Sequence, residues 1–103
     1  MTDRHGERWT TDEMAATVDA YLEMLRLQSQ ESVFTKADIV RQLLEGPLAG
    51  RTRKSVEFRF CNISSVLSEH SQPHVEGYLP LDHVGEKPRE MIINLLSKRG
   101  LDI

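Results

Sequence analysis

The residues best suited to chemistry form a cluster of cations near the middle of the chain. Positions 51 to 59 hold Arg51, Arg53, Lys54 and Arg59 against the single acid Glu57. The first three precede or begin a predicted helix, where free backbone N–H groups and the helix dipole already attract anions. Guanidinium and ammonium groups at such a place suit a phosphate backbone. We therefore predict that Arg51, Arg53 and Lys54 hold phosphates.

The outward side of the same predicted helix carries polar residues and one aromatic. Arg59, Asn62 and Ser65 are predicted to face a nucleic-acid groove, where their side chains suit base edges. Phe58 is the odd residue, because an aromatic ring on a polar face can stack on a base or wedge into a base step. For Phe58 alone the sequence favours the other interpretation, in which it packs beneath the turn at residues 77–80.

Tyr78 lies in that turn, Gly77-Tyr78-Leu79-Pro80, where Gly77 can adopt a positive φ and Pro80 stiffens the exit. The interpretation we favour is that Tyr78 caps the core with its hydroxyl outward. It is also a second candidate for a base contact.

Other chemistries are less well supported. His70 and His74 have the spacing of two metal ligands on a helix, but Pro73 lies between them and argues against helical geometry. With His83 they make a metal-assisted hydrolase a remote third hypothesis, and solvated loop histidines are the favoured interpretation. Cys61 is the only cysteine, and no phosphate loop or nucleophile motif is present. We predict a protein that is not an enzyme and needs no metal or cofactor.

Composition limits these interpretations. The chain has 103 residues and a net charge of −3, so nucleic-acid binding must come from a local basic surface. An apolar share of 39% and a charged share of 28% are typical of a soluble globular domain. No apolar run is long enough to cross a bilayer, and residues 1–8 lack the apolar core of a secretory signal. These features predict a cytoplasmic protein without a membrane partner.

Apolar periodicity predicts the elements that position the candidate residues. Thr10 and Glu13 have capping-box spacing before a first helix that ends in the polar stretch 28–32. A second helix starts near Thr35 and stops at residues 46–47, a third starts at Thr52 or Ser55, and a fourth opens near Pro88. The third helix should bury a seam at positions 56, 60, 63 and 67.

The fold class we predict is therefore a mainly α, four-helix small domain with an irregular or short extended segment before the last helix. Its second and third helices resemble a helix-turn-helix pair with a lengthened connector. We expect a flexible N-terminus over residues 1–8, a single domain over residues 9–100 and a C-terminal tail over residues 101–103.

An ordered set of short motifs runs from residue 9 to residue 80: Trp9-Thr10-x-x-Glu13, Val18-x-x-Tyr21, Glu57-x-Arg59-x-x-Asn62 and Gly77-Tyr78-x-Pro80. In this the chain resembles the small helical domain at the N-terminus of some bacterial HNH-type nucleases and related restriction or defence proteins. The resemblance implies a DNA-facing module that senses modified bases such as 5-methylcytosine in front of a nuclease. No HNH histidine and asparagine set follows, so it implies no cleavage, and residues 81–85 depart from the pattern.

Two functional hypotheses follow. The first is a non-catalytic module for double-stranded DNA, with modified DNA as the more specific ligand and a nuclease domain or subunit as partner. The second is a protein-interaction or homodimerisation module in which Phe58, Leu27 and the 91–96 stretch form an apolar contact. The sequence predicts no oligomeric state.

Overall fold

The computed structural model describes residues 8–81 and 84–103, and its described part contains four helices and no strand. The helices are α1 (Thr11–Ser29), α2 (Lys36–Glu45), α3 (Arg53–Glu69) and α4 (Glu86–Lys98). This confirms the predicted mainly α fold class. Of the predicted flexible N-terminus only Arg8 falls within the described residues, and His83 and its neighbour Asp82 lie outside them.

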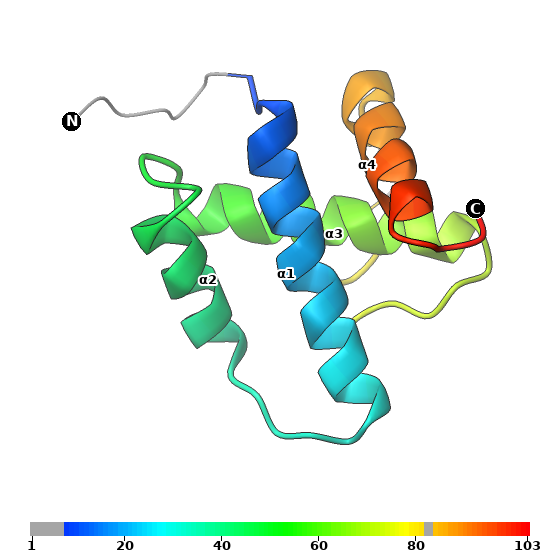
Figure 1. Ribbon diagram of the computed structural model, residues 1–103, viewed down its shortest axis with the longest axis horizontal. Helices are drawn as coiled ribbons and strands as arrows, with labels where there is room; N and C mark the ends of the chain where they lie inside the picture. The colour runs from blue at the N-terminus through cyan, green and yellow to red at the C-terminus, as the bar shows by residue number, and fades with distance from the viewer. Residues whose placement is uncertain (1–7, 82–83) are drawn as a thin grey trace.

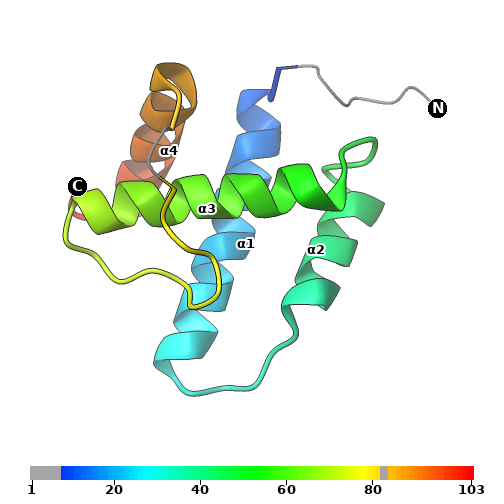
Figure 2. The same ribbon diagram turned by 180° about the vertical axis from the view of Figure 1, so that it is seen from behind.

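The helices form two layers. α2, α1 and α4 lie in one layer, and α3 crosses behind them, as the two opposite views show (Figure 1, Figure 2). α3 packs against each of the other three helices, and α1 packs against α2 and α4. One side of α3 therefore faces the core, and the opposite side faces solvent or the segment that leads to α4.

Local capping explains where α1 and α3 begin. Thr10 accepts from the backbone N–H of Glu13 at 3.1 Å, and the Glu13 carboxylate accepts from the backbone N–H of Thr10 at 2.9 Å. Thr52 and Ser55 form the equivalent pair at the start of α3. Both predicted start signals are confirmed, with Thr52 as the cap of α3. α4 begins at Glu86, two residues before the predicted Pro88, because Pro is accommodated within a first helical turn.

The core is built around α3. Its predicted seam is confirmed, because the four side chains are fully buried: Val56, Phe60, Ile63 and Leu67. Phe60 lies at the centre, with its ring centroid 6.0 Å from that of Tyr21 and 5.0 Å from that of Tyr78. Tilted aromatic pairs at these distances stabilise a core beyond simple burial. They fix the rotation of α3 about its axis.

The segment between α3 and α4 runs back across the outer side of α3 (Figure 2). It is anchored from α1: the Tyr21 hydroxyl accepts from the backbone N–H of Val75 at 2.9 Å, and Gln28 bonds the backbone of His74 and Glu76. Further along, the Ser65 hydroxyl donates to the carbonyl of Leu81. Part of the face that the sequence predicted to be free is therefore covered.

The end of the chain packs onto the domain. The backbone N–H of Leu101 donates to the carbonyl of Leu96 at 3.1 Å, and Leu101 and Ile103 contact the core. Residues 101–103 are thus part of the packed structure. No helix within the described ranges is both long and apolar enough to cross a membrane.

Candidate nucleic-acid interface

The first two turns of α3 form the part of the predicted interface that is open to solvent. Arg53 and Lys54 are exposed directly after the Thr52 cap. The Arg53 guanidinium lies 4.0 Å from the Glu57 carboxylate and borders a hollow lined by α2 residues. Their positions at the N-terminus of α3 are compatible with the predicted phosphate contacts.

Phe58 lies on the outer side of α3, one turn after Lys54. The sequence favoured a covered ring, and here that prediction is wrong, because 49% of Phe58 is exposed. The aromatic ring in the turn at 77–80 points elsewhere: Tyr78 packs on Phe60 in the core. Phe58 therefore remains the one exposed ring among the described aromatics of α3.

Arg51 does not take the predicted place on this surface. Its side chain is 2% exposed and forms a two-point ion pair with Glu13, with both N–O distances at 2.9 Å. It also donates to the carbonyl of Arg8 at 2.9 Å, and its guanidinium lies 5.1 Å from the centroid of the Trp9 ring. The prediction that Arg51 is an exposed phosphate ligand is thus corrected: it joins the start of α1 to the start of α3.

Asn62 and Ser65 are also buried, against the prediction that they face a groove. Ser65 lies beneath Leu81, to whose carbonyl it donates. The Asn62 side-chain oxygen accepts from the Arg59 guanidinium at 3.0 Å. The helical period identified their side of α3 correctly, but the segment after α3 and the start of α4 cover it.

Tyr78 is buried, and its hydroxyl is buried with the ring and has no hydrogen-bond partner among the described residues. The predicted core position of Tyr78 is confirmed. The predictions of an outward hydroxyl and of a base contact are wrong, because the hydroxyl is buried. Burial raises the pKa of Tyr78 to about 12, with Glu57 adding to the shift. Lys36 lies 5.7 Å from the centroid of its ring.

Arg59 points away from Lys54 and Phe58, towards the start of α1. Its guanidinium lies 5.1 Å from the Trp9 ring centroid. Burial lowers the pKa of Arg59, and the nearby positive charge of Arg51 lowers it further. Arg59 stays charged, because the pKa of an arginine lies far above neutral pH. The basic residues at 51–59 therefore do not form one patch: Arg51 is internal, and Arg59 faces another surface.

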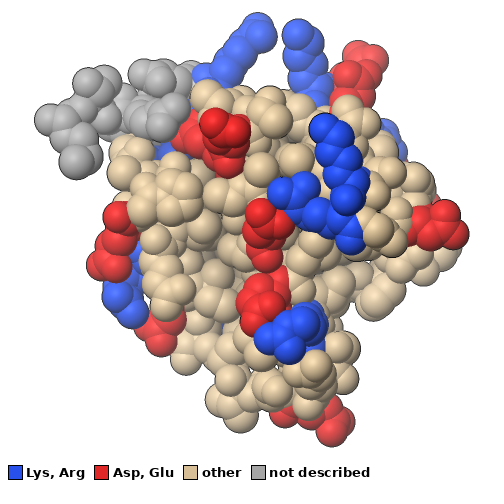
Figure 3. All heavy atoms as spheres, in the orientation of Figure 1, with Lys and Arg blue, Asp and Glu red and all other residues tan. Residues whose placement is uncertain are grey.

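The charge on the opposite face of the molecule is mixed. Basic and acidic side chains alternate over α1 and α4, with no broad region of one sign (Figure 3). This mixed face agrees with the net charge of −3 and does not favour a polyanion on this side of the molecule.

The remaining chemical candidates form no second site among the described residues. No cluster of three metal-ligating side chains is found there. His70 and His74 each direct a ring nitrogen to a backbone carbonyl, of Val66 and Val75 respectively. Burial, with a contribution from Glu57, raises the pKa of the Cys61 thiol, which disfavours the reactive thiolate.

Sequence reasoning missed Trp9, Arg8 and Lys87, which lie with Arg59 around one cleft. Trp9 was recognised only as part of a motif, and no local spacing links residues 8 and 87. No protein-family model, curated protein or solved structure matches this chain. The resemblance to the N-terminal domain of HNH-type nucleases therefore stays a prediction.

Proposed function

We propose that this protein is a non-catalytic module that binds double-stranded DNA through the first two turns of α3. The observation that carries the proposal is the exposed Phe58 ring, one turn after the exposed cations Arg53 and Lys54. In helix-turn-helix proteins the N-terminal residues of the second helix reach base edges. Here Arg53 and Lys54 would hold phosphates, and Phe58 would contact a base or a base step.

The surroundings support a rigid contact. Thr52 caps α3, and Phe60 on the inner side of the same turn packs between two buried tyrosines. α2 packs against α3 as the first helix of such a pair would. A fixed helix loses little conformational freedom on binding, which favours affinity from a small contact.

The proposal makes a quantitative demand on salt dependence. Two phosphate contacts predict a slope of roughly −2 for the logarithm of affinity against the logarithm of salt concentration. Fluorescence anisotropy with a labelled duplex over a salt series measures this slope. Lys54→Ala should reduce its magnitude by about one, since one contact is lost. Lys98→Ala, at the far end of α4, is the matched control and should leave the slope unchanged.

Phe58→Ala tests the aromatic contact separately. Stacking on a nucleic-acid base contributes about 1–3 kcal/mol, and its loss should weaken binding with the slope retained. Because the ring is half exposed, thermal unfolding should show that the variant stays folded. A complete lack of binding at low salt by the unaltered protein would sink the proposal.

The same assay addresses the more specific part of the proposal. The predicted resemblance implies a reader of modified DNA that works with a nuclease domain or subunit. Methylated and unmodified duplexes of one sequence should then differ in affinity, and Phe58→Ala should remove the difference. Equal affinity for both duplexes would leave a DNA-binding module without modification sensing.

A protein-interaction module is the second candidate, and a specific observation favours it. Besides Phe58, the exposed large apolar residues include Leu79 (68%) and Leu81 (40%), on the segment that crosses α3. In the 91–96 stretch of the predicted contact, Ile92, Leu95 and Leu96 are buried, whereas Met91 and Ile93 are half-buried. For a homodimer, light scattering should show a molar mass that rises with protein concentration. The Phe58→Ala variant should keep the mass of a monomer.

A further inference from the structure

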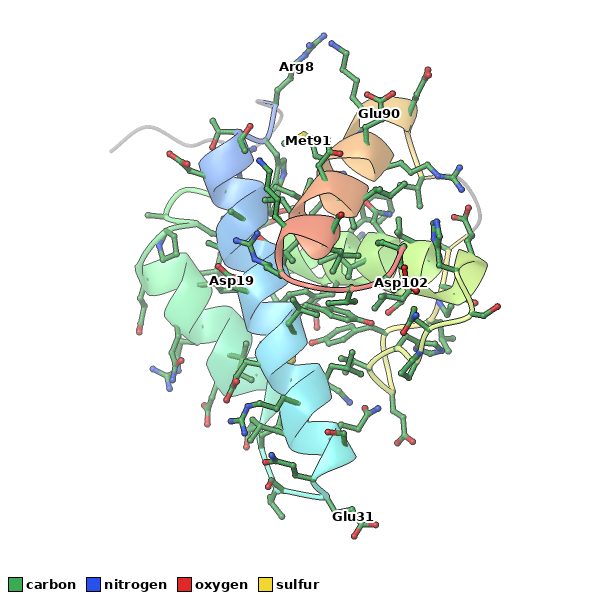
Figure 4. All side chains as sticks on the ribbon, turned by 45° about the vertical axis from the view of Figure 1, so that its right-hand side comes forward. Arg8, Asp19, Glu31, Glu90, Met91 and Asp102 are labelled. Atoms are coloured by element: carbon green, nitrogen blue, oxygen red, sulfur yellow. The ribbon has the colours of Figure 1, made fainter. Side chains whose placement is uncertain are left out.

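A cleft of about 450 Å³ lies at the end of the molecule where α1 and α4 both begin. Its walls come from the residues before α1, the first turn of α1, α3 and the first turns of α4: Arg8, Trp9, Thr10, Thr11, Met14, Arg59, Lys87, Pro88 and Met91. Figure 4 shows Arg8 above Met91, between the two helix starts. A volume of this size is within the range of small-molecule sites.

The charged residues that line the cleft in the described part of the chain are all basic. Arg8, Arg59 and Lys87 come from three separate segments, and no described aspartate or glutamate is among the lining residues. Glu90 lies on the next turn of α4 but outside the lining (Figure 4). Three cations border one cleft, and no described carboxylate lines it, so the cleft favours an anion over a cation.

Arg59 is the most informative of the three. It is half-buried, and its contacts in the described part of the chain are the Asn62 side-chain oxygen at 3.0 Å and the Trp9 ring. None of the described carboxylates forms an ion pair with it. Half-burial of a guanidinium with no ion pair to a described carboxylate is unfavourable, and a bound anion would offset that loss of solvation.

Apart from Thr10 and Thr11, the other described lining residues are apolar. Trp9, Met14, Pro88 and Met91 give the cleft a hydrophobic floor and side. Such a surface suits an aromatic or aliphatic group attached to the anion, because apolar burial adds affinity that charge alone does not provide. An inorganic ion would leave this part of the cleft empty.

The buried Arg51 holds the wall of the cleft in place. It donates to the carbonyl of Arg8 and pairs with Glu13, which in turn caps the start of α1 at Thr10. Both Arg51 and Arg59 lie against the Trp9 ring. The backbone at Arg8 and the Trp9 ring are therefore held by contacts inside the domain, whereas the Arg8 side chain is exposed.

We propose that the Arg8–Arg59–Lys87 cleft binds a phosphate monoester attached to an aromatic or apolar body. A free mononucleotide and the 5′-phosphorylated end of a nucleic-acid strand share this chemistry. The phosphate contacts the three cations, and the attached body lies against Trp9, Met14 and Met91. The exposed residues proposed to bind DNA, which include Lys54 and Phe58, lie on a different side of α3 from this cleft. The proposal therefore does not depend on DNA binding by the first turns of α3.

Isothermal titration calorimetry with adenosine 5′-monophosphate and with adenosine tests the phosphate requirement. Adenosine 5′-monophosphate should bind, and adenosine should bind at least roughly tenfold more weakly, because charged hydrogen bonds to phosphate are lost. Lys87→Met and Arg59→Met should each weaken nucleotide binding roughly tenfold. Lys87 is exposed, so its variant reports on binding even if the Arg59 variant unfolds.

Lys98→Met is the matched control, because it removes an exposed lysine at the C-terminal end of α4, away from both proposed sites, and should leave nucleotide affinity unchanged. Oligonucleotides with a 5′-phosphate or a 5′-hydroxyl distinguish a strand end from a free nucleotide as the source of the phosphate. Equal binding of adenosine and its monophosphate would overturn the proposal. The same conclusion would follow from unchanged affinity in Lys87→Met.

Discussion

Glu13→Gln removes the negative charge of the buried Glu13–Arg51 ion pair while keeping the size of the side chain. The Arg51 and Glu13 side chains are 2% and 3% exposed, and two hydrogen bonds of 2.9 Å join them. The substitution leaves a buried guanidinium without its carboxylate. Breaking one partner of such a pair costs about 3–5 kcal/mol, because the remaining buried charge loses the opposite charge that offsets its desolvation.

This loss is large for the whole domain, since a protein of this size has a free energy of unfolding of about 5–15 kcal/mol. Each kcal/mol lowers the melting temperature of a domain of 60–100 residues by roughly 4–8 °C. Glu13→Gln should therefore lower the melting temperature by at least about 12 °C. Urea unfolding followed by circular dichroism measures the change in free energy directly.

Two controls separate the possible causes. Asp38→Asn breaks the Arg41–Asp38 pair, whose side chains are 57% and 59% exposed, and should cost no more than about 1 kcal/mol. Thr10→Ala removes the cap of α1 without touching the pair and should cost about 1 kcal/mol. A larger loss of stability in Glu13→Gln than in these controls would then be caused by the buried charge.

A double-mutant cycle with Arg51→Met completes the test. Replacing both partners removes the buried charge that a single substitution leaves, so the double variant should be more stable than the sum of the single effects predicts, by up to about 3 kcal/mol. Additive single effects would refute the reasoning. So would a Glu13→Gln variant within about 1 kcal/mol of the unaltered protein.

Two further predictions concern the buried tyrosines. Tyr21→Phe should lower the free energy of unfolding in urea by about 1–3 kcal/mol, because the hydroxyl of Tyr21 contacts Ser64 at 2.7 Å and accepts from the backbone N–H of Val75. Tyr78→Phe should be neutral or stabilising, since its buried hydroxyl has no hydrogen-bond partner among the described residues. A greater loss of stability in Tyr78→Phe than in Tyr21→Phe would contradict this assignment. Burial raises the pKa of Tyr21, and it raises that of Tyr78 from 10.0 to about 12. The folded protein thus holds these protons more tightly than the unfolded chain, so the stability that they contribute is fully present below about pH 10 and declines as the pH rises towards 12. Unfolding measured from about pH 9 upward should show this decline, and it should be smaller in the Tyr21→Phe, Tyr78→Phe double variant; identical pH profiles would contradict the cause given.

The sequence by itself determined the helices and their inner faces. Caps such as Thr10–Glu13 and the period of the α3 seam depend on residues three or four positions apart, and the energies that fix them are local. The same period showed that Asn62 and Ser65 lie away from the seam. The mainly α fold class and most of the buried helical positions followed from these local patterns.

Only the tertiary structure decided which polar residues stay exposed. Arg51 pairs with Glu13, which lies 38 residues earlier in the sequence, and no local spacing pattern predicts an ion pair between them. Ser65 is covered where the segment after α3 brings Leu81 against it, whereas Phe58, on the same helix, stays exposed. The Arg8–Arg59–Lys87 cleft likewise exists only where three distant segments meet. Helical periodicity gives the direction of a side chain, but packing between distant segments decides what covers it.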